Sequence, residues 1–96
     1  MNINLTVLIK SKPTHSATLA VLLHNLVANS TKEEACIQYE LHQSTEDEDI
    51  FILHEIWKDQ QGLDLHNQEP HLIAFGKAAA GLLDSPATIY KTKIIS

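Results

Sequence analysis

Hydrophobic residues recur at every second position in several stretches of the chain, which is the pattern of a β-strand with one buried face. The clearest case is residues 2–10, where four apolar side chains alternate with mostly polar ones. Three later stretches alternate in the same way or are rich in β-branched and aromatic residues, namely residues 34–43, 49–58 and 87–96. The pattern therefore predicts four strands.

Between these strands, apolar residues recur at helical spacing. Leucines on one face predict a helix over residues 15–29, after the break at Lys12-Pro13. A short amphipathic segment at 59–68 precedes a further helix over 70–83. Pro70 suits the first position of that helix, because its missing N–H would have no partner there. Pro70 is therefore expected to separate two helices.

The resulting order, β-α-β-β-α-α-β, predicts a single α+β domain over residues 1–96 with a ferredoxin-like antiparallel sheet and helices on one face. The third strand is apolar on both sides, because isoleucines at 50, 52 and 56 alternate with Phe51, Leu53 and Trp57. A face without helices would then expose apolar side chains to water. We therefore expect a homodimer in which two sheets pack together.

Charge and composition exclude several classes of partner. Twelve acidic residues against seven lysines, with no arginine, give a net charge of −5, which would repel a nucleic-acid backbone. No apolar run approaches the roughly 20 residues that span a bilayer, and the first ten residues lack the basic start of a signal peptide. The single cysteine, Cys36, has no internal disulfide partner and apolar neighbours, which indicates a buried thiol. We expect a cytoplasmic protein without nucleic-acid or membrane partners.

The segment "LHNQEPH", residues 65–71, contains two histidines five positions apart. On a continuous helix their side chains would point about 140° apart around the axis, and the His-x-x-x-His spacing of zinc enzymes is absent. We therefore expect no metal. Because imidazole titrates close to neutral pH, a histidine that faces a pocket can accept a phenolic proton. His66 and His71 are the candidates, unless they only bond backbone or solvent near helix ends; neither is expected in the core.

Three residues of the predicted strands carry further candidate chemistry. Glu55 and Trp57 share a face, since they lie two residues apart. Glu55 is expected either beside a helix histidine with a raised pKa or at an exposed sheet edge. Trp57 either lines a pocket or fills the core. Tyr39 either presents its hydroxyl to a pocket or satisfies a buried backbone group.

The runs "CIQYELHQ" and "FILHEIWKDQQGLDLHNQEPHLIAF" resemble the antibiotic biosynthesis monooxygenase family, whose members are dimeric α+β barrels. The resemblance combines a Tyr-Glu strand, a Glu-x-Trp strand end and a His-x-x-x-Pro-His helix junction. It implies a small-molecule site between sheet and helices, in a family that includes cofactor-independent oxygenases of quinols and polycyclic phenols. The matching motif positions are Tyr39, Glu55, Trp57, His66, His71 and Phe75.

The same superfamily contains phosphosugar isomerases and haem-degrading enzymes, so the resemblance implies a fold more firmly than a reaction. Haem degradation is disfavoured, because Gly76 stands where those relatives carry the iron-ligating histidine and His66 where they carry a tryptophan. The absence of arginine removes the bidentate clamp best suited to phosphate or carboxylate.

We therefore expect a monooxygenase that needs no cofactor and oxidises a small aromatic or quinol-like substrate with dioxygen. His66 and His71 would move protons, Tyr39 and Glu55 would orient the reactants, and Trp57 and Phe75 would form pocket walls. The alternatives are an isomerase of a small carbonyl or phosphosugar compound and a non-catalytic binding or stress-related module.

Overall fold

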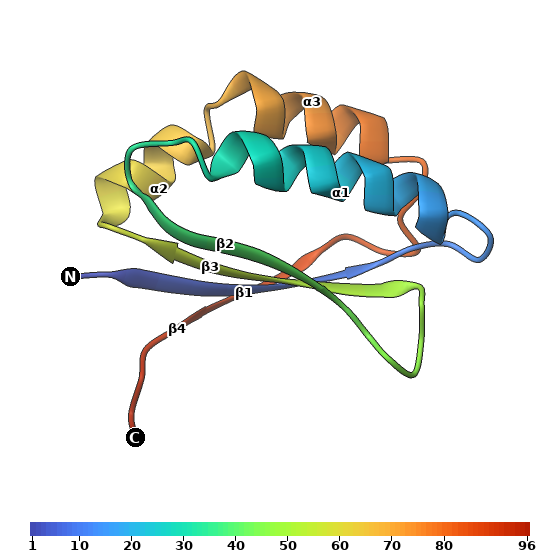
Figure 1. The fold of residues 1–96 in the computed structure, drawn as a ribbon, viewed down its shortest axis with the longest axis horizontal. Helices are drawn as coiled ribbons and strands as arrows, with labels where there is room; N and C mark the ends of the chain where they lie inside the picture. Colours follow the sequence, from blue (N-terminus) through green and yellow to red (C-terminus); the bar gives the residue numbers. More distant parts are fainter.

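A computed structural model describes residues 1–96, and its helices and strands follow the predicted order. The strands are β1 (Ile3–Lys10), β2 (Cys36–Gln43), β3 (Ile50–Trp57) and β4 (Thr88–Thr92), and the helices are α1 (Ser16–Ser30), α2 (Gln60–His66) and α3 (Pro70–Ala79). The sheet has the order β2-β3-β1-β4, with antiparallel neighbours throughout. All three helices lie on one face of this sheet (Figure 1). The predicted ferredoxin-like α+β fold is confirmed.

The last two elements are shorter than the pattern predicted. Helix α3 ends at Ala79, because the chain after it pairs with the end of β1: the N–H of Lys12 donates to the carbonyl of Leu82, and the N–H of Asp84 donates to that of Lys10. Strand β4 is an edge strand that pairs only with residues 4–8 of β1. Its residues are all exposed, and the strand ends at Thr92.

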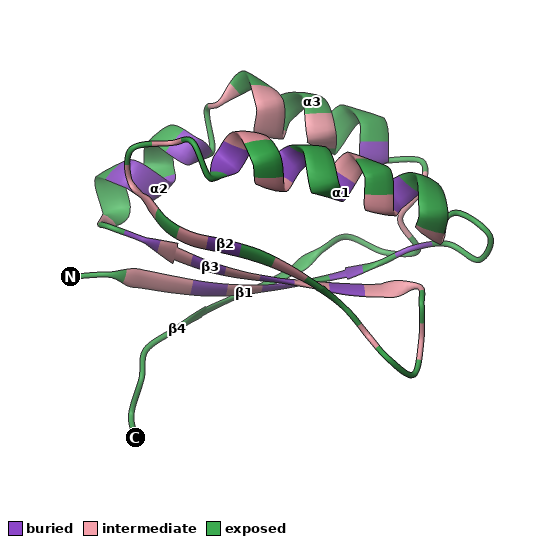
Figure 2. Ribbon diagram, in the orientation of Figure 1, coloured by how far each residue is buried: buried purple, intermediate pink, exposed green.

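The core lies between the helices and the sheet, as Figure 2 shows. From α1, leucines 19, 23 and 26 are buried, and they face the alternate residues of β1 and β3. Strand β3 buries Phe51, Leu53, Glu55 and Trp57 on this face. Because β3 is a central strand, Glu55 has Leu5 of β1 on one side and Tyr39 of β2 on the other. The alternative of an exposed Glu55 at a sheet edge is therefore wrong.

No helix covers the other face of the sheet (Figure 1). The isoleucines of β3 that point there, at 50, 52 and 56, are half-buried, and Leu8 of β1 beside them is exposed. This face also carries Glu40, His42 and His54. None of the three helices has the length and apolarity needed to cross a membrane.

Candidate functional site

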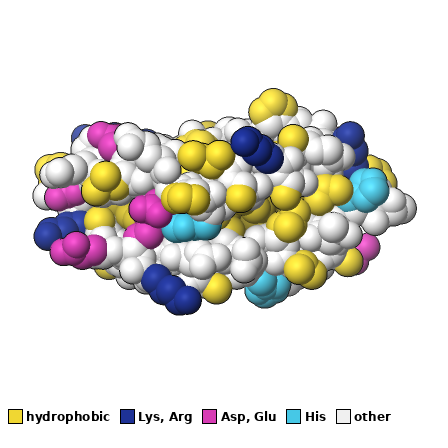
Figure 3. Space-filling view, turned by 90° about the horizontal axis from the view of Figure 1, so that it is seen from above, with side chains coloured by type: hydrophobic (Ala, Val, Ile, Leu, Met, Phe, Trp, Pro, Cys, Tyr) yellow, Lys and Arg dark blue, Asp and Glu magenta, His cyan; other side chains and the backbone are white.

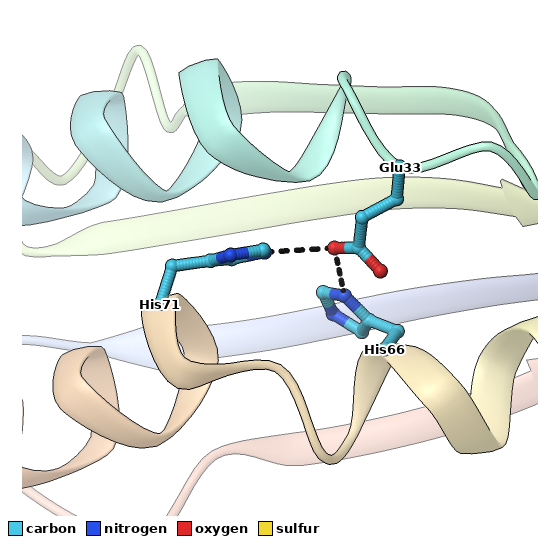
Figure 4. A group of neighbouring side chains, drawn as sticks. All are labelled: Glu33, His66 and His71. Atoms are coloured by element: carbon cyan, nitrogen blue, oxygen red, sulfur yellow. Dashed lines mark hydrogen bonds and ion pairs between the residues drawn. The ribbon is translucent and has the colours of Figure 1, made fainter.

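Three side chains from three separate segments meet at one carboxylate oxygen. Glu33 lies in the turn after α1, His66 is the last residue of α2, and His71 is the second residue of α3. Oε2 of Glu33 lies 2.7 Å from Nδ1 of His66 and 2.8 Å from Nε2 of His71 (Figure 4). A carboxylate only accepts hydrogen bonds, so both ring nitrogens donate to Glu33. We call these three residues the Glu33 cluster.

The expectation that His66 and His71 point to different sides is wrong. It assumed one continuous helix, but α2 ends at His66 and α3 begins at Pro70. Glu69, the residue before the proline, is extended (φ −65°, ψ 135°), because the proline ring disfavours helical backbone at that position. The chain therefore changes direction between the two histidines, and both rings turn toward the end of α1 (Figure 4).

Sequence reasoning missed Glu33. It is one of two adjacent glutamates in "TKEEACIQYE", and no local pattern distinguishes it from the exposed Glu34. The structure separates them clearly, because only 11% of the Glu33 side chain is exposed. A charged group at this depth requires hydrogen-bond partners, and the two histidines provide them.

Close packing of α2 against the turn after α1 brings Glu33 and His66 together. Asp59 caps α2 by accepting from the N–H of Gly62 at 2.8 Å. A Cβ on Gly62 would lie 2.3 Å from Cβ of Ala35, so only glycine permits this approach. The N–H of Lys58 also donates to the carbonyl of Ala35 at 2.9 Å. The start of α2 is thus tied to the turn that carries Glu33.

His66 lies inside the core, contrary to the expectation for this residue. It is 3% exposed. Its ring lies over that of Trp57, with centroids 4.3 Å apart and planes at 33°, and it meets Tyr39 edge-on at 5.6 Å. The aromatic neighbours restrict the orientation of the imidazole. His71 is more accessible, with 20% of its side chain exposed.

Glu55 is buried, but its partner is not a histidine. It is 5% exposed and accepts a hydrogen bond from Nε1 of Trp57 at 2.9 Å. Burial raises the pKa of Glu55 to about 7, the Trp57 bond opposes this rise, and the charge of Glu33 adds to it. Glu55 therefore exchanges its proton near neutral pH.

Two other groups near Glu55 stay protonated. Burial, together with the charge of Glu55, raises the pKa of Tyr39 well above its usual range, so its phenol is neutral. Cys36 is half-buried, and burial followed by the charges of Glu33 and Glu55 raises its pKa to about 11. Its thiol is therefore a poor nucleophile at neutral pH.

A largely hydrophobic cavity of about 160 Å³ lies between the helices and the sheet. Tyr39, Glu55, His66 and Phe75 line it, together mainly with aliphatic side chains, and no lysine does. Trp57 is fully buried and does not line the cavity; it fills the core and holds His66 and Glu55, which do line it. His71 instead lines a groove between α1 and α3, which it shares with Phe75.

A second hollow, of about 400 Å³, lies on the outer side of the Glu33 cluster and is polar. Its lining carries four acidic side chains, those of Glu33, Glu34, Asp59 and Glu69, and one lysine. In Figure 3, which looks onto the helices, acidic side chains lie next to a histidine among hydrophobic ones. The Glu33 cluster thus stands between an apolar cavity and an acidic surface hollow.

Residues 3–78 match the family model of antibiotic biosynthesis monooxygenases. The chain is 30% identical over 86 residues, 90% of either chain, to "Putative monooxygenase YcnE" of Bacillus subtilis. It is also 30% identical to the solved structure of PA3566 from Pseudomonas aeruginosa, with a TM-score of 0.93 over 99% of this chain and 95% of that one. The solved structure of "Putative antibiotic biosynthesis monooxygenase" from Nitrosomonas europaea shares the fold with a TM-score of 0.93 at 16% identity, over 98% of this chain and 90% of that one.

Proposed function

The chain belongs to the antibiotic biosynthesis monooxygenase family, and from this premise we propose that it is a cofactor-independent monooxygenase of a small aromatic or quinol-like compound. The observation that carries the proposal is an apolar cavity of about 160 Å³ with His66 in its wall. An apolar cavity of roughly 150 Å³ in another protein accommodates benzene. The volume therefore suits one substituted aromatic ring.

His66 is the proposed proton acceptor. Its Nδ1 donates to Glu33 at 2.7 Å, so the neutral ring carries its proton on Nδ1 and has its lone pair on Nε2. The buried carboxylate also stabilises the imidazolium that forms when Nε2 takes up a phenolic proton. Glu33 and His71 thereby act as positioning residues that hold the ring in one tautomer.

The reaction needs no group beyond the substrate and dioxygen. Loss of the phenolic proton to His66 leaves an electron-rich anion, which transfers an electron to dioxygen. Recombination forms a C–O bond, and the resulting hydroperoxide loses water to leave a quinone. One oxygen atom enters the product, the other leaves as water, and the substrate supplies all the electrons. Most of the lining is aliphatic, so a bound ring displaces water from around the reacting atoms.

Two polar groups in the cavity wall suit this chemistry. Glu55, with a pKa of about 7, can donate a proton to the departing oxygen at neutral pH and regain it. Tyr39 stays a neutral phenol, so it can donate a hydrogen bond to a substrate oxygen. Phe75 contributes the aromatic wall. The isomerase alternative lacks support, because no lysine lines the cavity and the chain has no arginine to hold a phosphate.

The proposal includes a homodimer in a reducing compartment such as the cytoplasm. The half-buried isoleucines of β3 on the face without helices support the dimer. The single cysteine, which has no disulfide partner within the chain, supports the compartment.

An oxygen electrode tests the proposal with a panel of monocyclic hydroquinones and catechols. Wild-type protein should consume oxygen faster than buffer for at least one of them. His66→Asn, which keeps a polar side chain but lacks the accepting nitrogen, should reduce the rate by roughly a hundredfold or more. His24→Ala, on the exposed side of α1, is the matched control and should retain the rate. Equal rates in His66→Asn and wild type contradict the role of His66, and no rate above buffer with any compound contradicts the function.

A further inference from the structure

The Glu33 cluster has the composition of a metal site as well as that of a proton-transfer site. One carboxylate oxygen and two imidazole nitrogens, one atom from each residue, all lie within 4.8 Å of one another. Two histidines and one carboxylate form a ligand set used by zinc and by non-haem iron, and imidazole also suits nickel and copper. The spacing argument against metal binding relied on a continuous helix, which the break at Pro70 removes.

We propose that Glu33, His66 and His71 form a binding site for one divalent first-row transition-metal ion, of the class of Zn²⁺. Bonds of about 2.1 Å in a tetrahedral site separate the ligand atoms by about 3.4 Å. Oε2 of Glu33 now lies 2.7 and 2.8 Å from the two nitrogens. Withdrawal of the glutamate side chain by less than about an ångström from each ring gives that spacing between the oxygen and each nitrogen. The two nitrogens, which lie within 4.8 Å of one another, come to the same spacing by a small rotation of the rings. Both nitrogens already point toward the space from which the oxygen withdraws (Figure 4).

The surroundings of the cluster favour a cation. Oε2 of Glu69 lies 3.8 Å from Nδ1 of His71, the ring nitrogen that would not bind the ion. A carboxylate behind a ligating histidine is the usual partner that orients the ring and raises its basicity. The acidic hollow, in which Glu33, Glu34, Asp59 and Glu69 face water, raises the local concentration of cations at the site.

An ion can reach the cluster without opening the core. The side chains of Glu33 and His71 are 11% and 20% exposed, and Glu33 forms part of the wall of the acidic hollow. Only three protein ligands are present, so water from the hollow would complete the coordination sphere. Ligation at Nδ1 moves the ring proton of His66 to Nε2. If the proposed oxygenase function holds, a bound ion therefore inhibits it.

The chain offers a matched control on the opposite face of the sheet. His42 and His54 lie side by side, with ring centroids 5.0 Å apart, and Nε2 of His42 is 2.6 Å from a carboxylate oxygen of Glu40. This second group has similar residue types, lies on the face proposed for the dimer, and is solvent-exposed at Glu40 and His42 in the single chain. If an ion bound to the protein only weakly and nonspecifically through exposed histidines, removal of this second group would reduce that binding.

The test titrates chelator-stripped protein with Zn²⁺ by calorimetry and with Co²⁺ by visible absorption, both without substrate. We expect one ion per chain and Co²⁺ bands typical of nitrogen and oxygen ligands. Glu33→Gln and His71→Ala should each weaken binding roughly tenfold or more, while the double variant His42→Ala/His54→Ala should bind as wild type does. These ligand variants avoid the buried His66, and circular dichroism verifies that each is folded.

Several outcomes overturn the site: no saturable binding by wild type, unchanged affinity in folded Glu33→Gln and His71→Ala, or loss of binding only in the His42/His54 variant. Because the titration contains no substrate, it is independent of turnover. If the protein binds the ion but consumes no oxygen, the metal site is supported and the oxygenase function is contradicted. If it consumes oxygen but binds no ion, the oxygenase function is supported and the metal site is contradicted.

Discussion

Replacement of Glu33 by alanine tests whether the Glu33 cluster holds the turn after α1 to the two later helices. The change removes the only hydrogen-bond partner of Nδ1 of His66, a residue that is 3% exposed. A buried donor without a partner costs about 1–3 kcal/mol. The second bond, to the more accessible His71, adds about 0.5–1 kcal/mol, because water can replace it there. We expect a loss of about 1.5–4 kcal/mol in the free energy of unfolding.

For a domain of this length, 1 kcal/mol corresponds to about 4–8 °C in Tm, so Glu33→Ala should lower Tm by roughly 6–32 °C. Urea and thermal unfolding followed by circular dichroism measure the change. Glu34→Ala is the matched control, since it removes the adjacent, exposed carboxylate and should change stability by less than about 0.5 kcal/mol. Equal stabilities of the two variants would refute the structural role assigned to the Glu33 cluster.

Three other predictions address the carboxylate in the cavity wall, the packing of α2 and the exposed sheet face. The folded-state pKa of Glu55 is raised from 4.5 to about 7, so its contribution to stability is full below pH 4.5 and is lost as pH rises through 7. Between pH 4.5 and 8, the free energy of unfolding in urea should fall on the order of 3 kcal/mol more for the wild type than for Glu55→Gln. If the two proteins lose stability equally over this range, the raised pKa is contradicted. Gly62→Ala should destabilise the protein by about 1–3 kcal/mol, because the new Cβ would lie 2.3 Å from that of Ala35. The control Gly76→Ala, where nothing lies within 4 Å of the new Cβ, should stabilise α3 by up to about 1 kcal/mol. A Gly62→Ala variant as stable as wild type would show that α2 does not need this close approach. Sedimentation should give twice the chain mass, and Ile52→Lys, on the face without helices, should give the monomer; a wild-type monomer would contradict the dimer.

The hydrophobic pattern was sufficient to predict the order of the elements. Strands and helices differ in the spacing of their apolar residues, and prolines or polar turns separate one element from the next. Alternation along β3 also predicted that Glu55 and Trp57 share a face, and they do so closely enough to hydrogen-bond. These are local properties of the chain. They depend on backbone geometry that repeats within a few residues.

The parts that the sequence could not predict depend on contacts between distant segments. Glu33 is 33 residues from His66 and 38 from His71, and its role follows from how α2 packs on the turn after α1. The shared orientation of the histidines follows from the angle between α2 and α3. The position of Pro70 predicts that the helix breaks there but does not predict this angle. The early end of α3 follows from pairing of residues 82–84 with the end of β1.

Incorporation of ¹⁸O from labelled dioxygen tests the central claim most directly. Chelator-treated wild-type protein and a hydroquinone that it consumes should yield a quinone with one ¹⁸O atom per molecule by mass spectrometry, and His66→Asn should yield almost none. Autoxidation of a hydroquinone produces an unlabelled quinone and hydrogen peroxide, so the label separates oxygenation from background chemistry. An unlabelled product, or equal labelling by wild type and His66→Asn, would contradict a cofactor-independent monooxygenase that uses His66 as its base.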